Sequence, residues 1–324
     1  MKRTLTSRFS ARFSTTVGAI ALGFSLFASA HAKTECPPVP QAPTQAQLAD
    51  GMKNAKDRGA LWTIAKDGRT SYLFGTLHVG QMAWAFPGPK LTQALRETQV
   101  LAVEVDITAP STQAEMQTAM GQAAKLELSE KDQARLDAQA DAACIPRAAL
   151  ASLHPVMQAI TYVVLSGRHD GLDAAYGQEP NLIGFARAQQ RPIVSLESIA
   201  SQMAVLLPKD VAAARQSFDR VLTDLEAGKS RGQLARIGKA WETGNMDMIS
   251  SLEKLCECQP TDEERTFTKV LNDDRNPHIA QRIAEEHAKG KPVLAAVGLL
   301  HMTGPKSLTR LLAEQGFEVK RVAY

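Results

Sequence analysis

Two histidines follow the same local pattern near opposite ends of the sequence. The segments Gly75–His78 and Gly298–His301 each come after an apolar run, and each is closed by a further glycine. Apolar runs of this kind predict buried strands, and the glycines predict tight exits from them. Site residues commonly follow the ends of strands. The repeated pattern therefore predicts that two strands of one sheet deliver two imidazoles to one pocket.

Two glutamates follow other apolar runs in the same way. Glu104 comes after Val100–Val103, and Glu197 ends the run that begins at Ile193. Imidazoles and carboxylates together are a ligand set for Zn²⁺, Mn²⁺ or Co²⁺. Such a divalent metal lowers the pKa of a bound water and polarises a carbonyl, which favours hydrolysis near neutral pH.

We expect the four strand-end residues to act as catalytic residues. His78, Glu104 and His301 are the predicted metal ligands, and Glu104 and Glu197 supply a ligand and a general base in either order. The same side chains also fit a metal-free scheme, in which a histidine activates water and a carboxylate orients its ring. A single histidine after a strand is more often structural, and Glu197 can equally cap the helix predicted to start near Ser198.

Other polar residues carry weaker signals. Arg275 and Asn276 are candidates for holding a substrate carboxylate or an oxyanion, although a solvated helix surface is the simpler interpretation. Asp106 shares a strand face with Glu104 but could equally cap the next helix. The segment Gly171–Asp173 reads as a turn before a helix. Motifs typical of serine hydrolases, zinc-binding helices and phosphate-binding loops are absent from the sequence.

Residues 1–32 have the features of a signal peptide. Four basic residues precede an apolar run from Val17 to Phe27, and Ala30–Ala32 is a small-residue cleavage site. The run is short for an uncleaved anchor, so we expect a periplasmic or secreted protein that does not stay inserted in the membrane. The full sequence has 37 basic and 34 acidic side chains, and the leader carries four of the basic ones. The mature chain is therefore nearly neutral, which gives no reason to expect a nucleic-acid partner.

The remaining chain divides into an arm and one domain. Residues 33–58 contain four prolines and are expected to form an extended arm. Residues 59–324 are expected to form one α/β domain, whose central mixed sheet is built from both chain ends and flanked by helices, with a helical insertion at about 110–290. Asp67-Gly68 predicts a hairpin turn. Four cysteines favour disulfides in an exported protein, and three pairings are open; Cys256 and Cys258 could also form half of a metal site.

The ordered set of motifs resembles the TraB/GumN family, which is related to the Tiki proteases and to erythromycin-esterase-like proteins. The resemblance is carried by Tyr72–Gly80, Val103–Asp106, Ser195–Glu197 with Gln202, Asp274–Asn276 and Val297–Gly304. It implies an α/β fold with a site of two Gly-x-x-His motifs and glutamates. It also supports roles for Arg275 and Asn276, and some relatives it points to are peptidases that use Mn²⁺ or Co²⁺.

The predicted function is therefore that of an exported metal-dependent hydrolase, most simply a peptidase. A metal-free esterase-type hydrolase and a peptide-binding protein without catalytic activity remain alternatives. The expected ligand is a peptide or another small molecule, and the sequence leaves the oligomeric state open.

Overall fold

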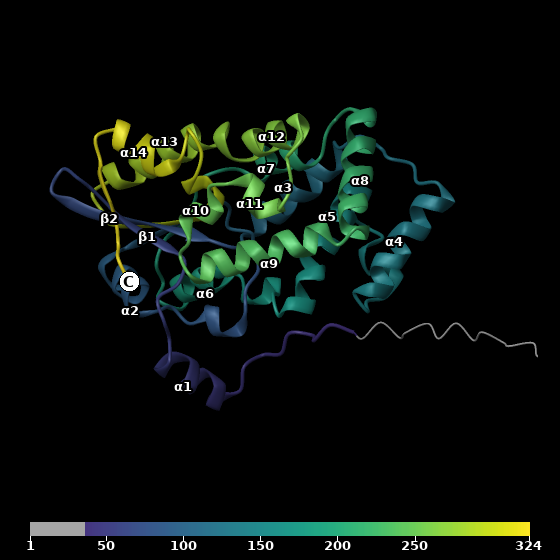
Figure 1. The fold of residues 1–324 in the computed structure, drawn as a ribbon. Coiled ribbons are helices and arrows are strands. Elements are labelled where there is room, and N and C mark those ends of the chain that lie inside the picture. The colour runs from purple at the N-terminus through teal and green to yellow at the C-terminus, as the bar shows by residue number, and fades with distance from the viewer. Residues whose placement is uncertain (1–35) are drawn as a thin grey trace, which may run out of the picture. The chain divides into compact units, whose positions relative to one another are not determined.

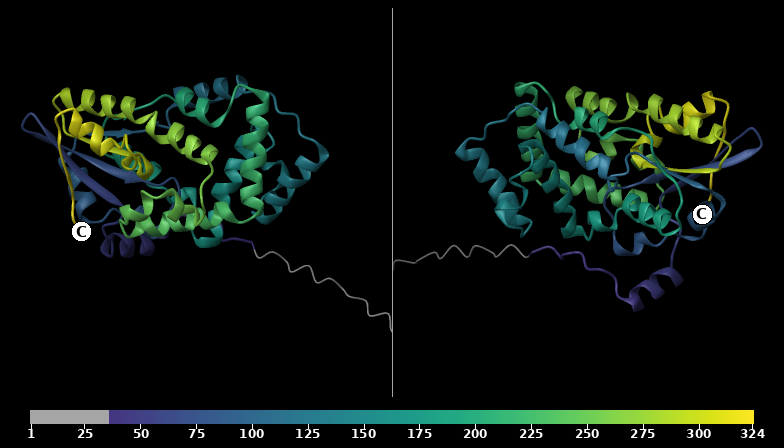
Figure 2. Two further views of the ribbon diagram at one scale, coloured as in Figure 1. Left: turned by 45° about the horizontal axis from the view of Figure 1, so that its top comes forward. Right: turned by 180° about the vertical axis from the view of Figure 1, so that it is seen from behind.

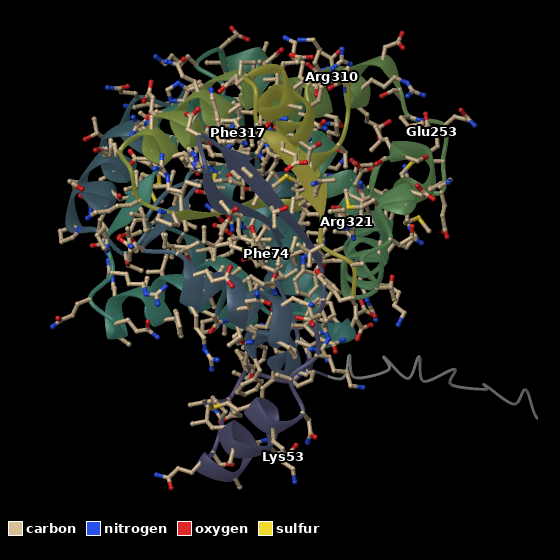
Figure 3. The ribbon with its side chains drawn as sticks, turned by 90° about the vertical axis from the view of Figure 1, so that its left-hand side faces the viewer. Lys53, Phe74, Glu253, Arg310, Phe317 and Arg321 are labelled. Carbon is tan, nitrogen blue, oxygen red and sulfur yellow. A yellow bond between two sulfur atoms is a disulfide. The ribbon has the colours of Figure 1, made fainter. Side chains whose placement is uncertain are left out.

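The computed structural model describes residues 36–324, so the predicted signal peptide lies outside the described residues. In the arm, the structure differs from the expectation of an extended segment, because helix α1 spans Gln45–Lys53. Thr44 caps this helix in a capping box with Gln47, and the proline-free sequence that follows consists largely of good helix formers. No residue of α1 is buried, and Figure 3 shows the helix, with Lys53, set apart from the strands.

The domain is built on one mixed sheet with the strand order β4-β3-β5-β2-β1-β6. The four strands β4, β3, β5 and β2 are mutually parallel, whereas β1 is antiparallel to both β2 and β6. Strands from both chain ends therefore join one sheet, which confirms the predicted fold class (Figure 1). The strands span Ala60–Lys66 (β1), Arg69–Thr76 (β2), Val100–Val103 (β3), Ile193–Ser195 (β4), Val293–Gly298 (β5) and Glu318–Arg321 (β6).

The hairpin between β1 and β2 turns where the sequence predicts it. Asp67 and Gly68 both have positive φ, at 52° and 72°, and Lys66 pairs with Arg69 across the turn. Positive φ at both central residues matches the right-handed twist of the flanking strands, and an Asp-Gly pair adopts it at low cost. The turn fixes the register of β2, and through β2 it sets the position of the first Gly-x-x-His motif.

Helices cover both faces of the sheet. Helices α13 (Asn276–Ala288) and α14 (Leu308–Glu314) lie on one side, and α2 (Pro89–Glu97) and α6 (Gln178–Ala188) lie on the other (Figures 1 and 2). The helices of the middle region extend beyond the sheet. They are α3 (Pro110–Gly121), α4 (Glu130–Ala142), α5 (Pro155–Ser166), α7 (Ile199–Leu206), α8 (Val211–Glu226), α9 (Lys229–Glu242), α10 (Met246–Ile249), α11 (Leu252–Cys256) and α12 (Asp262–Thr268).

The core consists of two hydrophobic clusters that meet beside the ends of the strands. The first is centred on the sheet and includes Val103 and Leu196. The second is formed mainly by helices α4, α5, α7 and α8 and includes Val105 and Ile199. Glu104 and Glu197 each lie between a residue of the first cluster and a residue of the second. Both carboxylates are therefore buried at the junction of the two clusters, where the neighbouring apolar side chains exclude water.

Two disulfides are present, and no free cysteine occurs among residues 36–324. Cys36 pairs with Cys144 and fastens the arm to the segment after α4, while Cys256 pairs with Cys258 at the end of α11. The alternative that Cys256 and Cys258 form half of a metal site is wrong, because their sulfur atoms are bonded to each other. In the described part of the chain, no helix has the length and apolar character needed to cross a bilayer.

Candidate functional site

Four polar residues follow the carboxyl ends of four adjacent parallel strands. Glu197 follows β4, Glu104 follows β3, His301 follows β5 and His78 follows β2, in the order in which the strands lie in the sheet. Strands β2 and β5 pair directly, with Gly75 opposite Val297. The carboxyl edge of a parallel sheet is the usual position for ligand sites in α/β folds. The structure thus brings all four predicted residues to one edge.

Glu104 is held as a carboxylate by its surroundings. Its Oε1 accepts a hydrogen bond from the Gly298 amide at 2.7 Å, and its Oε2 accepts from Gln202 and Arg275, each at 3.0 Å. Burial alone raises the pKa of this carboxyl group. Three neighbouring charges, those of His301 and His78 when their rings are protonated and that of Arg275, outweigh burial together with the Gly298 N–H and lower the pKa of Glu104 to about 2. Glu104 is therefore ionised at every pH of physiological interest.

The glycines of the two motifs are required by close packing. A Cβ atom at Gly75 would lie 2.3 Å from the side chain of Leu299, and one at Gly298 would lie 3.0 Å from Oε1 of Glu104. The first separation is a clash, and the second would push the carboxylate away from the Gly298 N–H. Both glycines therefore let the backbone approach the site closely.

His301, in the short helix η6 (Leu299–Met302), has a defined tautomer. The Asn276 amide nitrogen donates to the carbonyls of His301 and Lys306, at 3.1 and 2.8 Å, so the Asn276 Oδ1 must face the ring. That oxygen lies 2.5 Å from Nδ1 of His301 and accepts its proton. The lone pair of His301 is therefore on Nε2. Burial lowers the pKa of His301, which favours the neutral ring.

The unprotonated nitrogen of His301, Nε2, lies near the carboxylate of Glu104, and neither group can donate a hydrogen bond to the other. His301 Nε2 lies 3.8 Å from Oε1 of Glu104, which exceeds hydrogen-bond distance. A neutral Nε2 and an ionised carboxylate are both acceptors, so the gap between them suits a species that satisfies acceptors, either a water molecule or a cation. In a tetrahedral site, two ligand atoms at about 2.1 Å from one metal ion are about 3.4 Å apart, so the observed gap is slightly wider than such a site requires.

A second histidine–carboxylate pair involves a residue that sequence reasoning missed. His78 Nδ1 lies 3.8 Å from Oε2 of Glu179 in α6, whose Oε1 accepts a hydrogen bond from Thr76 at 2.9 Å. Burial raises the pKa of Glu179 to about 7, and the charge of Glu179 in turn raises the pKa of His78. The His78 side chain is 70% exposed and that of Glu179 only 11%, so the histidine forms the open side of the pair.

Glu179 was missed because it follows no strand. It lies in the first turn of α6, directly before Pro180, and that pattern is typical of an ordinary helix start. The neighbouring Gln178 gives the clearest reason for its position. The Gln178 Oε1 accepts a hydrogen bond from the Leu77 amide at 2.7 Å, which fastens the start of α6 to the end of β2.

Arg275 and Asn276 hold other residues of the site in place through hydrogen bonds. Arg275 donates to Glu104 at 3.0 Å, to both oxygens of Glu197, and to the Leu271 carbonyl at 2.9 Å. Asn276 is completely buried against His301. The hydrogen-bonding groups of both side chains therefore have partners within the protein, and their expected role in binding substrate stays a prediction. Glu197, only 2% exposed in its side chain, likewise serves to hold Arg275.

The helical segment just before Arg275 changes from an α-helix to a π-helical turn. Lys269–Asp273 (η5) forms a π-helical turn, and α13 then begins at Asn276 with a proline in its first turn. A proline is readily accommodated there because the first amides of a helix lack partners in any case. Arg275 therefore projects from the junction between two helical segments, and π-helical turns of this kind are frequent at functional sites.

The weaker candidates have structural roles. Asp106 accepts hydrogen bonds from Thr108 and forms an ion pair with Arg187 at 3.1 Å. Asp173 caps the short helix η4 (Ala174–Tyr176), forms an ion pair with Arg168 and pairs through its backbone with Gly80. The turn formed by residues 171–173 thus packs against the first histidine motif and helps to fix its conformation.

The predicted ligand set of His78, Glu104 and His301 is not assembled around one point. Among residues 36–324, no group of three or more histidine, cysteine, aspartate or glutamate side chains is close enough to hold a metal ion. His78 pairs with Glu179 instead, because α6 brings that carboxylate to the end of β2. The structure thus fits two protein ligands at the Glu104–His301 gap, and it does not fit the predicted set of three.

Sequence comparison agrees with this arrangement of motifs. The chain belongs to the TraB/PrgY/gumN family, whose model matches residues 60–321. The matched region contains all six strands of the sheet, together with every site residue described above. No curated protein and no solved structure matches the sequence.

Proposed function

We propose that this protein is a peptidase that hydrolyses a peptide bond at the carboxyl edge of the sheet. The observation that carries the proposal is the contrast between two neighbouring carboxyl groups. Glu104 is always ionised, with a pKa of about 2, whereas the pKa of Glu179 is about 7. A group that titrates near neutral pH is suited to general acid–base catalysis, and a permanent carboxylate is suited to binding and orientation.

Each residue then has a distinct role. Glu179 accepts a proton from the attacking water, and the oxygen of that water forms the new bond to the scissile carbonyl carbon. His78, whose pKa is raised by Glu179, donates a proton to the leaving nitrogen as the carbon–nitrogen bond breaks. An amide needs this protonation because its nitrogen leaves poorly as an anion, which favours a peptide over an ester as substrate. Glu104 and neutral His301 hold the water or the carbonyl in place.

A divalent cation fits the gap between Glu104 and His301 as an additional component. When bound there, it would polarise the scissile carbonyl and lower the pKa of a bound water. Glu104 Oε1 and His301 Nε2 would be its two protein ligands, and Asn276 would hold the imidazole by its other nitrogen, as partners of metal-bound histidines commonly do. We further propose that the protein acts in the periplasm or outside the cell, because residues 1–32 resemble a signal peptide.

The test is peptide cleavage by the purified mature protein, followed by mass spectrometry of a mixed peptide library. We expect cleavage by the native protein and a loss of about 10²-fold or more in the Glu179→Gln and His301→Ala variants. Glu314→Gln, a change of the same kind on the exposed face of α14, is the control and should retain full activity. Unchanged cleavage in both site variants would exclude this site as the catalytic centre.

Chelation separates the proposal from its alternatives. Activity that disappears with a strong chelator and returns with Mn²⁺, Co²⁺ or Zn²⁺ supports the role of a cation. Activity that persists in the chelator but disappears in the His78→Ala variant would favour the metal-free hydrolase. Tight peptide binding without turnover under any of these metals would favour the peptide-binding protein.

A further inference from the structure

An apolar cavity of about 600 Å³ lies between helices α2 and α6. Its volume falls within the range of pockets for small ligands. None of the two histidines and two glutamates that form the pairs described above lines it, although it adjoins the site at Gln178, which precedes Glu179. Most of the lining is aliphatic or aromatic, and it includes Trp84, Phe86, Leu91, Leu95, Leu182 and Phe185.

Helix α1 covers this cavity on the side of the sheet where α2 and α6 lie (Figure 1). Met52 of α1 lines the cavity, and a Cβ atom at Gly51 would lie 2.3 Å from the ring of Phe86, so α1 rests directly on the cavity wall. The arm is fixed on both sides of α1. Before the helix a disulfide ties it to the domain, and after the helix the Asp57 carboxylate accepts a hydrogen bond from the Lys90 amide of α2 at 2.8 Å. Because no residue of α1 is buried, a ligand can enter beneath this helix without disrupting the core.

The mouth of the cavity lies at the ends of α2 and α6 and carries a cation. Arg96, in the last turn of α2, and Gln189, at the end of α6, are exposed residues of the lining. Arg191 holds the two helix ends together, because its guanidinium donates to the carbonyls of Leu95 and Thr98. Arg96 forms no ion pair and no side-chain hydrogen bond with any residue between 36 and 324, and it is the one charged side chain in the lining. The cavity therefore combines an apolar interior with a free cation at its mouth.

The interior offers few hydrogen-bonding groups to a ligand. The polar side chains of Thr92, Gln178 and Asn181 already form hydrogen bonds with backbone groups of the protein. A peptide backbone or a sugar would leave several of its own polar groups unpaired here, and each of them would cost free energy. A hydrocarbon chain has no such groups, and its burial is favourable. The lining thus favours a ligand that is apolar along its length and negatively charged at one end.

We propose that this cavity binds a medium-chain fatty acid. The alkyl chain lies between α2 and α6 beneath α1, and the carboxylate pairs with the Arg96 guanidinium at the mouth. The proposal goes beyond the proposed function, because binding here breaks no bond and uses neither histidine–glutamate pair.

The first experiment compares ligands and needs no variant. Titration calorimetry is performed on the native mature protein with octanoate, decanoate, octanol and octylammonium. We expect decanoate to bind more tightly than octanoate by about three- to fourfold for each added methylene, because the added carbons are buried. Octanol should bind about three- to tenfold more weakly than octanoate, since it forms no ion pair with Arg96, and octylammonium should bind more weakly still.

Two results would overturn the assignment to a fatty acid. One is no binding of decanoate at millimolar concentration, and the other is octylammonium that binds as tightly as octanoate. These results are independent of the proposed function, because a protein that cleaves no peptide can still bind decanoate in this cavity, and an active peptidase can fail to bind it.

A first pair of variants tests the contact with the carboxylate. Arg96→Gln should lower the affinity for octanoate to about that for octanol, and it should leave the affinity for octanol unchanged. Arg310→Gln removes an exposed arginine of α14 that is paired with Glu314, so its effect on octanoate should stay within about twofold. Equal losses in both variants would reduce the interaction to the overall charge of the protein and contradict the contact with Arg96.

A second pair of variants tests the position of the alkyl chain. Leu91→Trp places a larger side chain in the cavity and should weaken octanoate and octanol alike, by tenfold or more. Leu48→Trp makes the same change on α1 at an exposed residue outside the lining, and it should leave both affinities unchanged. Undiminished binding of both ligands to the Leu91→Trp variant would mean that the chain binds elsewhere, which would overturn the proposal.

Discussion

The two glutamates Glu104 and Glu179 have different pKa values because their surroundings differ. Glu104 receives three hydrogen bonds and lies beside positive groups, whereas Glu179 is hydrogen-bonded by Thr76 and lies beside a histidine that is itself exposed. Burial disfavours the charge of both carboxyl groups, and only Glu104 has enough partners to outweigh it. Groups whose pKa values are driven apart in this way commonly divide the roles of binding and proton transfer.

The raised pKa of Glu179 predicts a particular dependence of stability on pH. Its folded-state pKa of about 7 lies above the ordinary value of 4.5, so the folded state binds more protons than the unfolded state between these values. The free energy of unfolding should therefore fall as pH rises from about 4.5 to 7. Glu179→Gln removes this contribution, and the variant should gain about 1–3 kcal/mol relative to the native protein between pH 5 and pH 8.

The measurement is urea unfolding of both proteins at pH 5 and pH 8, with the exposed Glu314→Gln variant as control. The control should follow the native protein at both pH values. If the difference between Glu179→Gln and the native protein is the same at pH 5 and pH 8, the carboxyl group does not titrate in this range.

At the residue scale, the sequence predicted which residues lie at the site better than it predicted what each of them does there. His78, Glu104, Glu197 and His301 could be found because each follows an apolar run, and strand ends of one parallel sheet share an edge. Glu179 could not, because it reaches the site from a helix. The motif around Arg275 was recognised, but burial decides between supporting a site and binding a substrate, and burial depends on the packing of distant segments.

Among the elements, α13 is joined to the sheet by a buried polar network. His287 is 1% exposed, with Nδ1 at 2.8 Å from the Ser71 hydroxyl and Nε2 at 3.1 Å from the Lys66 carbonyl. Because Nε2 faces a carbonyl, it carries the ring proton, so Nδ1 accepts a hydrogen bond from the Ser71 hydroxyl, which in turn accepts one from the Val293 amide. One imidazole thus ties a helix to strands β1, β2 and β5, at the end of the sheet opposite to the candidate site.

This network predicts loss of stability in mild acid. Burial lowers the pKa of His287 below its ordinary value of 6.5, so the unfolded state takes up a proton at a higher pH than the folded state. The free energy of unfolding should therefore fall as pH drops through 6.5 towards the lower folded-state pKa. We expect His287→Gln to lower the melting temperature at pH 7, because the network is disturbed, and to weaken its decline between pH 7 and pH 5.

The matched control is His278→Gln on the exposed face of the same helix. Melting temperatures measured at pH 5 and pH 7 for the native protein and both variants provide the comparison. An unaltered pH dependence in His287→Gln, or an equal change in His278→Gln, would contradict a titrating role for the buried ring.

The elements were predictable where local pattern and packing agree. The hairpin turn and the strands before the site residues match because apolar periodicity and turn residues both favour them. The strand predicted before Glu104 ends at Val103, although the Glu104 carbonyl still accepts a hydrogen bond from the Glu197 amide at 2.9 Å. Helix α1 was missed because the prolines just before it suggested an extended arm, although none lies within the helix.

At the scale of the whole molecule, a disulfide that closes a long loop joins the N-terminal arm to the domain. Cys36 and Cys144 are separated by 108 residues, whereas Cys256 and Cys258 are separated by two. In the chain-entropy model a disulfide stabilises by restricting the unfolded chain, and the effect grows with loop length. The sequence could not choose among three pairings, because the pairing depends on where the arm runs over the folded domain.

The two disulfides should therefore contribute unequally to stability. Replacing Cys36 and Cys144 by serine should reduce the free energy of unfolding by about 2–5 kcal/mol, and replacing Cys256 and Cys258 by about 1–2 kcal/mol. Denaturant unfolding of both double variants under non-reducing conditions gives the comparison. Equal losses, or a larger loss for the short loop, would mean that loop length does not govern the stabilisation.

The order of the strands also has a consequence for how the protein is made. Strand β5 lies between β2 and β3, yet it is synthesised about 190 residues after β3. Until residues 293–301 leave the ribosome, β2 and β3 have no shared neighbour and the second histidine does not exist. An emerging chain therefore cannot assemble the candidate site at the carboxyl edge of the sheet at any earlier stage. If the protein is a peptidase, this timing keeps it inactive throughout synthesis.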